Sequence, residues 1–238
     1  LGAERDLLDA GGTISYVQRD GPPWYETRSW MPLEASRVAE GMKKERQSLE
    51  KFAVKVLASW EELEMSQKNG EDPIIVSAGW VLTEKDEGMI KARLVAQEYG
   101  QKADGKREEY FCPTPRHMAH GVVMTMALEN GWEIAIGDVG TAFLHAEAHD
   151  ERPVFVIPPA SEAEELWRLK KALYGLRMSP RQFNKMFAKT VVDLGWQRLE
   201  MEPQLYKSLR YPGVLMSAHV DDLLFTAKKE DVEKISRS

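Results

Sequence analysis

Apolar and polar residues alternate with different periods along this chain, and the changes of period divide it into predicted elements. Leu49, Phe52, Ala53, Val56, Leu57, Trp60 and Leu63 recur at helical spacing, which predicts one amphipathic helix over 49–63. Two β-rich runs then flank the turn-forming sequence KDEG, which predicts a hairpin over 74–99. We therefore expect a helical region followed by a sheet-forming region.

The second half continues this interleaving. A helix is predicted over 117–130, with Met118, Val122, Thr125 and Met126 on one side and Asn130-Gly131 at its C-terminal end. A short strand, WEIAIGDV, follows it. The sequence SPRQ at 179–182 predicts a further helix that Ser179 caps, with Gln182 closing a capping box, and Gly195 ends it. The interleaving and the last antiparallel hairpin favour an α+β fold.

That last hairpin raises a chemical question, because VLMSAHVDDLLFTA places Asp221 and Asp222 side by side between apolar, β-prone residues. Asp138 ends an earlier strand, so all three carboxylates would converge if the two elements share a sheet. Three ionised carboxylates need a counter-charge, for which Mg²⁺ with oxygen ligands is the usual choice. The alternative interpretation is a solvated turn and an ordinary strand end.

Composition sets broad limits on function. The 238 residues carry a net charge of −6, 43% hydrophobic residues and one cysteine, Cys112, which excludes an internal disulfide and fits a reducing compartment. No apolar run reaches the ~20 residues that a membrane span requires, so we expect no membrane partner and an intracellular protein, either cytoplasmic or nuclear. The chain begins with Leu1 and ends in helix-like sequence, and we expect a fragment of a longer polypeptide.

Four motifs occur in a specific order: WVLTEKDEGMIKARLVAQEYGQ, GDVGTAFLHAE, LKKALYGLRMSPRQF and HVDDLL. Together they resemble the reverse transcriptase region of copia/Ty-type retrotransposon Pol polyproteins, over roughly Val38 to Ala227. The resemblance implies the fingers and palm of a right-hand polymerase, with a mixed or antiparallel palm sheet and helices packed on one face. It implies a poorly ordered segment at 1–35, a helical region at 36–73, fingers at 74–116 and a truncated palm at 117–238, without thumb or RNase H.

The same resemblance assigns roles to individual residues. Asp138, Asp221 and Asp222 would be the catalytic carboxylates that bind two Mg²⁺ ions, or Mn²⁺ in their place. Nucleotide contacts would come from Lys91, Arg93, Phe143, Tyr174 and Gly175. Phe143 would exclude a 2′-hydroxyl, unless it is simply a core residue. His219 stands where the family usually has Tyr, and this departure removes no catalytic carboxylate.

Charge distribution suggests where nucleic acid would bind. Seven basic residues and no acidic residue lie between Arg168 and Lys189, and Arg177, Arg181 and Lys185 are the predicted contacts to the phosphate backbone. A solvated helix face would carry the same charges.

The implied activity is RNA-directed DNA polymerisation, with an RNA or DNA template-primer, dNTPs and the rest of the Pol polyprotein, including integrase, as partners. The alternative is a catalytically silent, diverged remnant that binds only nucleic acid or a partner chain. A different two-metal enzyme, such as a nuclease, fits the KARLVA and YGLRMSP motifs less well.

Overall fold

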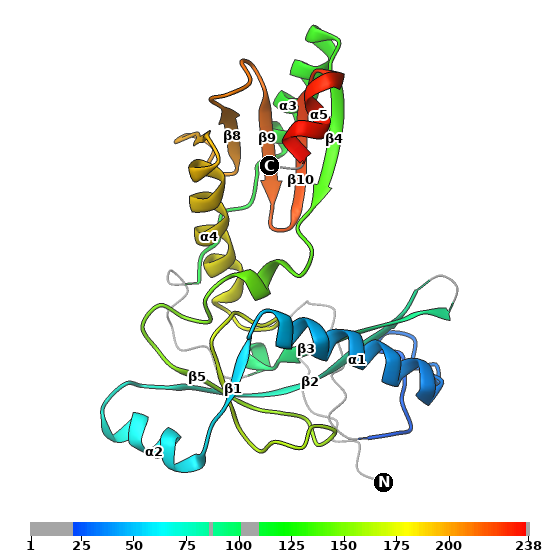
Figure 1. Cartoon of the computed structure of the whole chain (residues 1–238), viewed down its shortest axis with the longest axis vertical. Helices are drawn as coiled ribbons and strands as arrows, with labels where there is room; N and C mark the ends of the chain where they lie inside the picture. Colours follow the sequence, from blue (N-terminus) through cyan, green and yellow to red (C-terminus); the bar gives the residue numbers. More distant parts are fainter. Residues whose placement is uncertain (1–20, 86–87, 101–109, 237–238) are drawn as a thin grey trace. The chain divides into compact units, whose positions relative to one another are not determined.

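The computed structural model describes residues 21–85, 88–100 and 110–236, and the chain divides into two compact units (Figure 1). The first unit comprises residues 1–106 and 147–179, and the second comprises 107–146 and 180–238. Each unit has a sheet that contains five strands in the described part of the chain. Helices and strands are interleaved, so the predicted α+β class is confirmed. No helix among the described residues is long and apolar enough to cross a membrane.

The first unit is built around a long central strand. In chain order it contains α1 (Ala35–Lys51), β1 (Lys55–Leu57), α2 (Trp60–Lys68), β2 (Ile74–Glu84), β3 (Ile90–Ala96), β5 (Val154–Ile157) and β6 (Trp167–Leu169). Its strand order is β1-β6-β5-β2-β3, with β2 parallel to β5 and antiparallel to β3. Trp80 of β2, Phe155 of β5 and Trp167 of β6 are fully buried, and burial of the Phe155 side chain contributes ~1.5–3 kcal/mol. Because β2 and β3 pair in antiparallel fashion, the predicted hairpin over 74–99 is confirmed.

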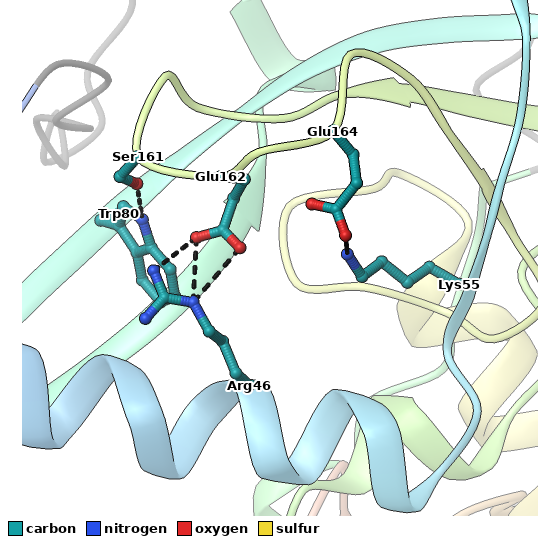
Figure 2. Close-up of polar contacts among 6 residues, drawn as sticks. All are labelled: Arg46, Lys55, Trp80, Ser161, Glu162 and Glu164. Carbon is teal, nitrogen blue, oxygen red and sulfur yellow. Dashed lines mark hydrogen bonds and ion pairs between the residues drawn. The ribbon is translucent and has the colours of Figure 1, made fainter.

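Polar contacts attach the segment before β6 to α1 and β1 (Figure 2). The Arg46 guanidinium of α1 donates to Glu162, with Nη2 lying 2.6 Å from Oε1, and lies over the Trp80 ring at 5.3 Å. The Trp80 indole N–H donates to the Ser161 hydroxyl at 2.9 Å. Because the Glu162 side chain is only 8% exposed, its charge depends on Arg46 for compensation.

The prediction of a single helix over 49–63 is wrong, because three separate elements cover this region. The helix α1 ends at Lys51, Ala53 adopts a positive φ of 48°, and the chain then forms β1, which pairs with β6. A separate helix, α2, begins at Trp60, where the Ser59 hydroxyl accepts a hydrogen bond from the Glu62 N–H at 3.2 Å. Apolar residues that share one helical period thus belong to three elements, α1, β1 and α2. The Ser-x-x-Glu sequence at 59–62 is the capping signal that marks this boundary.

The second unit carries an antiparallel sheet. It contains α3 (His117–Asn130), β4 (Glu133–Asp138), α4 (Ser179–Asp193), β7 (Trp196–Arg198), β8 (Leu205–Ser208), β9 (Leu215–His219), β10 (Asp222–Ala227) and α5 (Lys229–Ser236), with Ser179 itself assigned to the first unit. The strand order is β4-β10-β9-β8-β7, so β10 lies between β4 and β9 (Figure 1). The predicted last hairpin is therefore confirmed and has β4 as its neighbour.

Helix α3 has the predicted bounds, and Gly131 ends it with a φ of 62°. Its buried face, however, is formed by Ala119, Val123 and Ala127. Of the residues predicted to share one side, Met118 is 78% exposed, Val122 and Thr125 are also exposed, and Met126 is half-buried. Small side chains let the helix approach β9 and β10 closely, and this packing requirement overrides the size of the methionines.

Helix α4 begins at the predicted Ser179, but its start is built differently from a capping box. The Ser179 N–H donates to the Leu176 carbonyl at 3.3 Å, and its hydroxyl donates to the Leu173 carbonyl at 2.6 Å. Ser179 therefore anchors the turn that precedes the helix.

Two helix glycines give a matched test of the packing of α1 on β3. A Cβ on Gly41 would lie 2.5 Å from the Ile90 carbonyl oxygen, whereas a Cβ on Gly121 of α3 would meet nothing within 4 Å. We expect Gly41→Ala to lower the free energy of unfolding by ~1–3 kcal/mol through overpacking. Gly121→Ala should raise it by ~0.5–1 kcal/mol through helix propensity. Urea denaturation of both variants measures the difference, and two changes of the same sign would contradict the close approach.

Candidate active site

The register of the sheet in the second unit places two predicted catalytic aspartates at directly opposed strand positions. Asp138 is the last residue of β4 and Asp222 the first of β10, and they are paired in the antiparallel ladder. The Val139 N–H donates to the Asp221 carbonyl at 2.9 Å, so Val139 and Asp221 form a hydrogen-bonded pair. The adjacent pair is then of the closely spaced type, in which Cβ atoms lie ~4.5–5.5 Å apart. Asp138 and Asp222 therefore share one face of the sheet.

Asp221 reaches this point through the hairpin turn. His219 pairs with Asp222, which leaves Val220 and Asp221 as the two turn residues. Val220 has a φ of 56°, a conformation that β-branched residues rarely adopt. Backbone strain of this kind costs conformational free energy and occurs most often at functional sites. His219, the departure from the family pattern, is beside Asp222 in the same cross-strand row.

The donor chemistry of this edge suits a hard divalent cation. Asp138 and Asp222 are exposed and supply carboxylate oxygens, which are the ligands that Mg²⁺ prefers. Within the described ranges, however, no group of three or more His, Cys, Asp or Glu side chains is arranged to hold a metal ion. The fold therefore places Asp138 and Asp222 at opposed strand positions, and Asp221 directly precedes Asp222 in the turn.

Phe143 lies five residues after Asp138, in a short 3₁₀ helix over Ala142–His145. Its half-buried ring meets Phe183 of α4 edge-on at 6.1 Å. Phe183 stacks on Phe187 at 5.8 Å, and Phe187 contacts Tyr206 of β8, so Phe143 is joined to a row of rings that enters the core. This position is compatible with both interpretations of Phe143, because the ring packs against Phe183 and the residue is only half-buried.

Tyr174 and Gly175 are fixed against β3 in the first unit. The Ala96 N–H donates to the Tyr174 carbonyl at 2.7 Å, and Val95 and Tyr174 form a parallel bridge. Gly175 has a φ of 86°, and a Cβ there would lie 2.0 Å from the Ala96 carbonyl oxygen. The glycine is therefore required by the approach of two backbone segments, a reason that the sequence interpretation missed.

The next turn is held by a buried carboxylate. Glu98, which is 4% exposed, accepts a hydrogen bond from the Arg177 N–H at 2.7 Å. The backbone between Tyr174 and Arg177 is thus attached to the segment around β3 at both ends.

The structure places Arg93 in a contact that sequence reasoning did not find. Its Nη1 lies 3.7 Å from Oε2 of Glu45 on α1, and its guanidinium carbon lies 4.6 Å from the centroid of the Tyr174 ring. Burial raises the pKa of the Glu45 carboxyl, and the charge of Arg93 opposes part of that rise. The signal in the sequence was a glutamate on the buried face of a helix, in line with Val38, Met42 and Leu49. Lys91 lies on the same face of β3 as Arg93 and is exposed.

The predicted basic segment is divided between the units and partly neutralised. Arg168 pairs with Glu62, Lys171 with Glu147, and Lys189 with Asp193. Arg181 and Lys185 are exposed and lie four residues apart on α4, so they share one helix face. Arg177 is half-buried in the first unit.

The fold and the carboxylates define an α+β protein whose exposed acidic edge is suited to divalent-cation chemistry. The family model described as reverse transcriptase (RNA-dependent DNA polymerase) matches residues 64–236, which is most of the chain. The chain belongs to this family, and the resemblance noted in its motifs is confirmed.

Two relatives agree with this assignment. The chain is 25% identical over 224 residues to the "Retrovirus-related Pol polyprotein from transposon TNT 1-94" of Nicotiana tabacum, covering 86% of this chain and 17% of that protein. It is 29% identical over 163 residues to the polyprotein from transposon RE2 of Arabidopsis thaliana, covering 64% and 11%. The chain thus spans under a fifth of the length of these relatives. A foamy viral protease-reverse transcriptase in complex with ds DNA aligns with a TM-score of 0.41 and 11% identity, over 95% of this chain and 31% of that one.

Substituting Gly175 tests the backbone approach at Tyr174. Gly175→Ala should lower the free energy of unfolding by more than ~3 kcal/mol, because it adds a backbone clash to the strain of a positive φ. Gly195→Ala is the matched control, since Gly195 has a φ of 90° but open space around it, and strain alone should cost ~1–2 kcal/mol. Equal losses in chemical denaturation would mean that the clash does not exist.

Proposed function

We propose that this chain catalyses RNA-directed DNA polymerisation, the transfer of a nucleotide from a dNTP to the 3′-hydroxyl of a primer. The observation that carries the proposal is the cross-strand pairing of Asp138 with Asp222, beside Asp221, in a chain of the reverse transcriptase family. Like charges held opposite each other are destabilising, so a sheet that keeps them there needs another reason for doing so.

The reaction assigns each residue a task. The primer 3′-oxygen attacks the α-phosphate and forms a new P–O bond, while the bond to pyrophosphate breaks and the hydroxyl proton passes to solvent water. Asp138, Asp221 and Asp222 would hold two Mg²⁺ ions, or Mn²⁺ in their place, which stabilise charge on the attacking and leaving oxygens when bound. Asp138 and Asp222 contribute from the ends of strands and Asp221 from the turn, each by holding its oxygens in place before the substrate arrives.

The proposed nucleotide contacts other than Phe143 belong to the first unit. Arg93 offers a planar fork of donors and Lys91 a mobile point charge, both suited to a triphosphate. Tyr174 and Gly175 shape the adjoining backbone. Arg181 and Lys185 on α4, with Arg177, are proposed to contact the phosphate backbone of the template-primer. The further proposed partners are the remaining segments of the Pol polyprotein.

Loss of one facing carboxylate tests the proposed chemistry. Asp138→Asn should lower kcat for single-nucleotide addition about a thousandfold, because the transition state loses ~4 kcal/mol of charge stabilisation. Stability should stay equal or rise by up to ~1 kcal/mol, because repulsion across the strands is relieved. Addition of dTTP to oligo(dT) on poly(rA), with Mg²⁺ or Mn²⁺, and thermal unfolding are the measurements.

Asp193→Asn is the control for that experiment, because it removes a surface carboxylate paired with Lys189. It should leave kcat unchanged. If the unaltered chain adds no nucleotide yet still binds the template-primer, the silent-remnant alternative is correct.

Truncation of Phe143 tests the proposed exclusion of ribonucleotides. Phe143→Ala should raise the ratio of rNTP to dNTP incorporation by roughly ten- to a hundredfold, because removal of a steric clash is worth ~1–3 kcal/mol. Phe187→Leu serves as the control, since it perturbs the same aromatic row in the core at a cost below ~1.5 kcal/mol. A Phe143→Ala protein with an unchanged ratio and a lowered melting temperature would make Phe143 a packing residue only.

A further inference from the structure

The buried carboxylate of Glu45 is the basis of a further inference. The side chain is 4% exposed and comes from α1, which lies before the residues that the family model matches. Its Oε1 accepts a hydrogen bond from the Leu94 N–H at 3.3 Å, and its Oε2 lies 3.7 Å from Arg93. A buried carboxylate is costly unless it is paired and hydrogen-bonded, so Glu45 is tied to two consecutive residues of β3.

Arg93 is held from two directions. Glu45 contacts one end of the guanidinium, while the Tyr174 ring lies 4.6 Å from its central carbon. The side chain remains 25% exposed. A guanidinium has five N–H donors, so a single carboxylate leaves donors available for a second, planar or anionic ligand.

The groups that hold Arg93 are themselves fixed. The Tyr174 backbone is bonded to Ala96, and the absence of a side chain on Gly175 permits that contact. On the other side, Gly41 lets α1 approach Ile90 of β3. Arg93 therefore lies between two supports that belong to the same unit, and its orientation is set before any ligand binds. Preorganisation of this kind lowers the entropic cost of binding.

We propose that Glu45 is a positioning residue that orients Arg93 toward the triphosphate of the incoming dNTP, with Tyr174 as the second support. The inference rests on the proposed polymerase function and adds α1 to the nucleotide-binding apparatus. A purely structural role would instead use the same ion pair only to attach α1 to β3.

Glu45→Gln separates the two roles, because the amide keeps an acceptor for Leu94 and removes the charge that orients Arg93. In addition of dTTP to oligo(dT) on poly(rA), KM for dTTP should rise about tenfold, equivalent to ~1.4 kcal/mol. The kcat should change less than about threefold, and the melting temperature should stay within ~2 °C. Glu45→Gln combined with Arg93→Lys should raise KM no further than Arg93→Lys alone, because Glu45 acts through Arg93.

Glu162→Gln is the matched control, since it removes another nearly buried carboxylate that is paired with an arginine of the same region, Arg46 of α1. It should leave KM unchanged and lower the melting temperature, because Glu162 is bound to Arg46 at 2.6 Å, whereas 3.7 Å separates Glu45 from Arg93. An unaltered KM in Glu45→Gln, with normal addition by the unaltered chain, overturns the positioning role alone. Additive effects in the double variant do the same. No addition by the unaltered chain with either metal overturns the proposed function and this inference together.

Discussion

Register between β4 and β10 is the constraint on which the candidate site depends. Two aspartates face each other across these strands, and their mutual repulsion opposes that arrangement. Apolar burial holds the register, because Phe225 and Ala227 of β10 are buried and a shift by one residue would turn them to the other face. The small buried face of α3 packs against β9 and β10 and reinforces it. The acidic edge is thus maintained by a core that contains none of the carboxylates.

The hairpin turn carries a second local cost. A valine with positive φ is strained where glycine or asparagine would be relaxed, yet Val220 occupies that position immediately before Asp221. The two-residue turn fixes the aspartates at consecutive positions, one in the turn and one at the start of β10. Packing of the surrounding strands must offset both the strain and the repulsion. At this edge, the position of the aspartates is therefore maintained against the backbone preference of Val220 and against the repulsion of like charges.

Elements that a local signal specifies could be predicted from the sequence. The turn sequence after β2, the glycine after α3 and the apolar runs around the Asp-Asp pair each specify an element almost alone. Elements that depend on long-range packing could not be predicted in this way. The residues from 49 to 63 have one period but belong to three elements, because β1 gains a partner in β6, more than a hundred residues later. The buried face of α3 was likewise decided by the closeness of β9 and β10. The contact between Glu45 and Arg93 could not be predicted from spacing, although a charge on an apolar helix face was visible.

Around β3, the role that a motif suggests for a residue differs most clearly from the physical reason for that residue. Gly175 belongs to a motif that suggests nucleotide binding, yet the glycine is required because the Ala96 carbonyl would touch any side chain there. Glu98 fixes the following turn through the Arg177 N–H, and Glu45 satisfies the Leu94 N–H at the outer edge of the strand. Two buried carboxylates thus bond backbone groups on and beside one strand, and each would be costly without its partner. Such an arrangement gives β3 and the Tyr174 backbone little freedom to move independently. A rigid support of this kind is what a fork of donors on Arg93 needs if it is to meet a phosphate in one orientation.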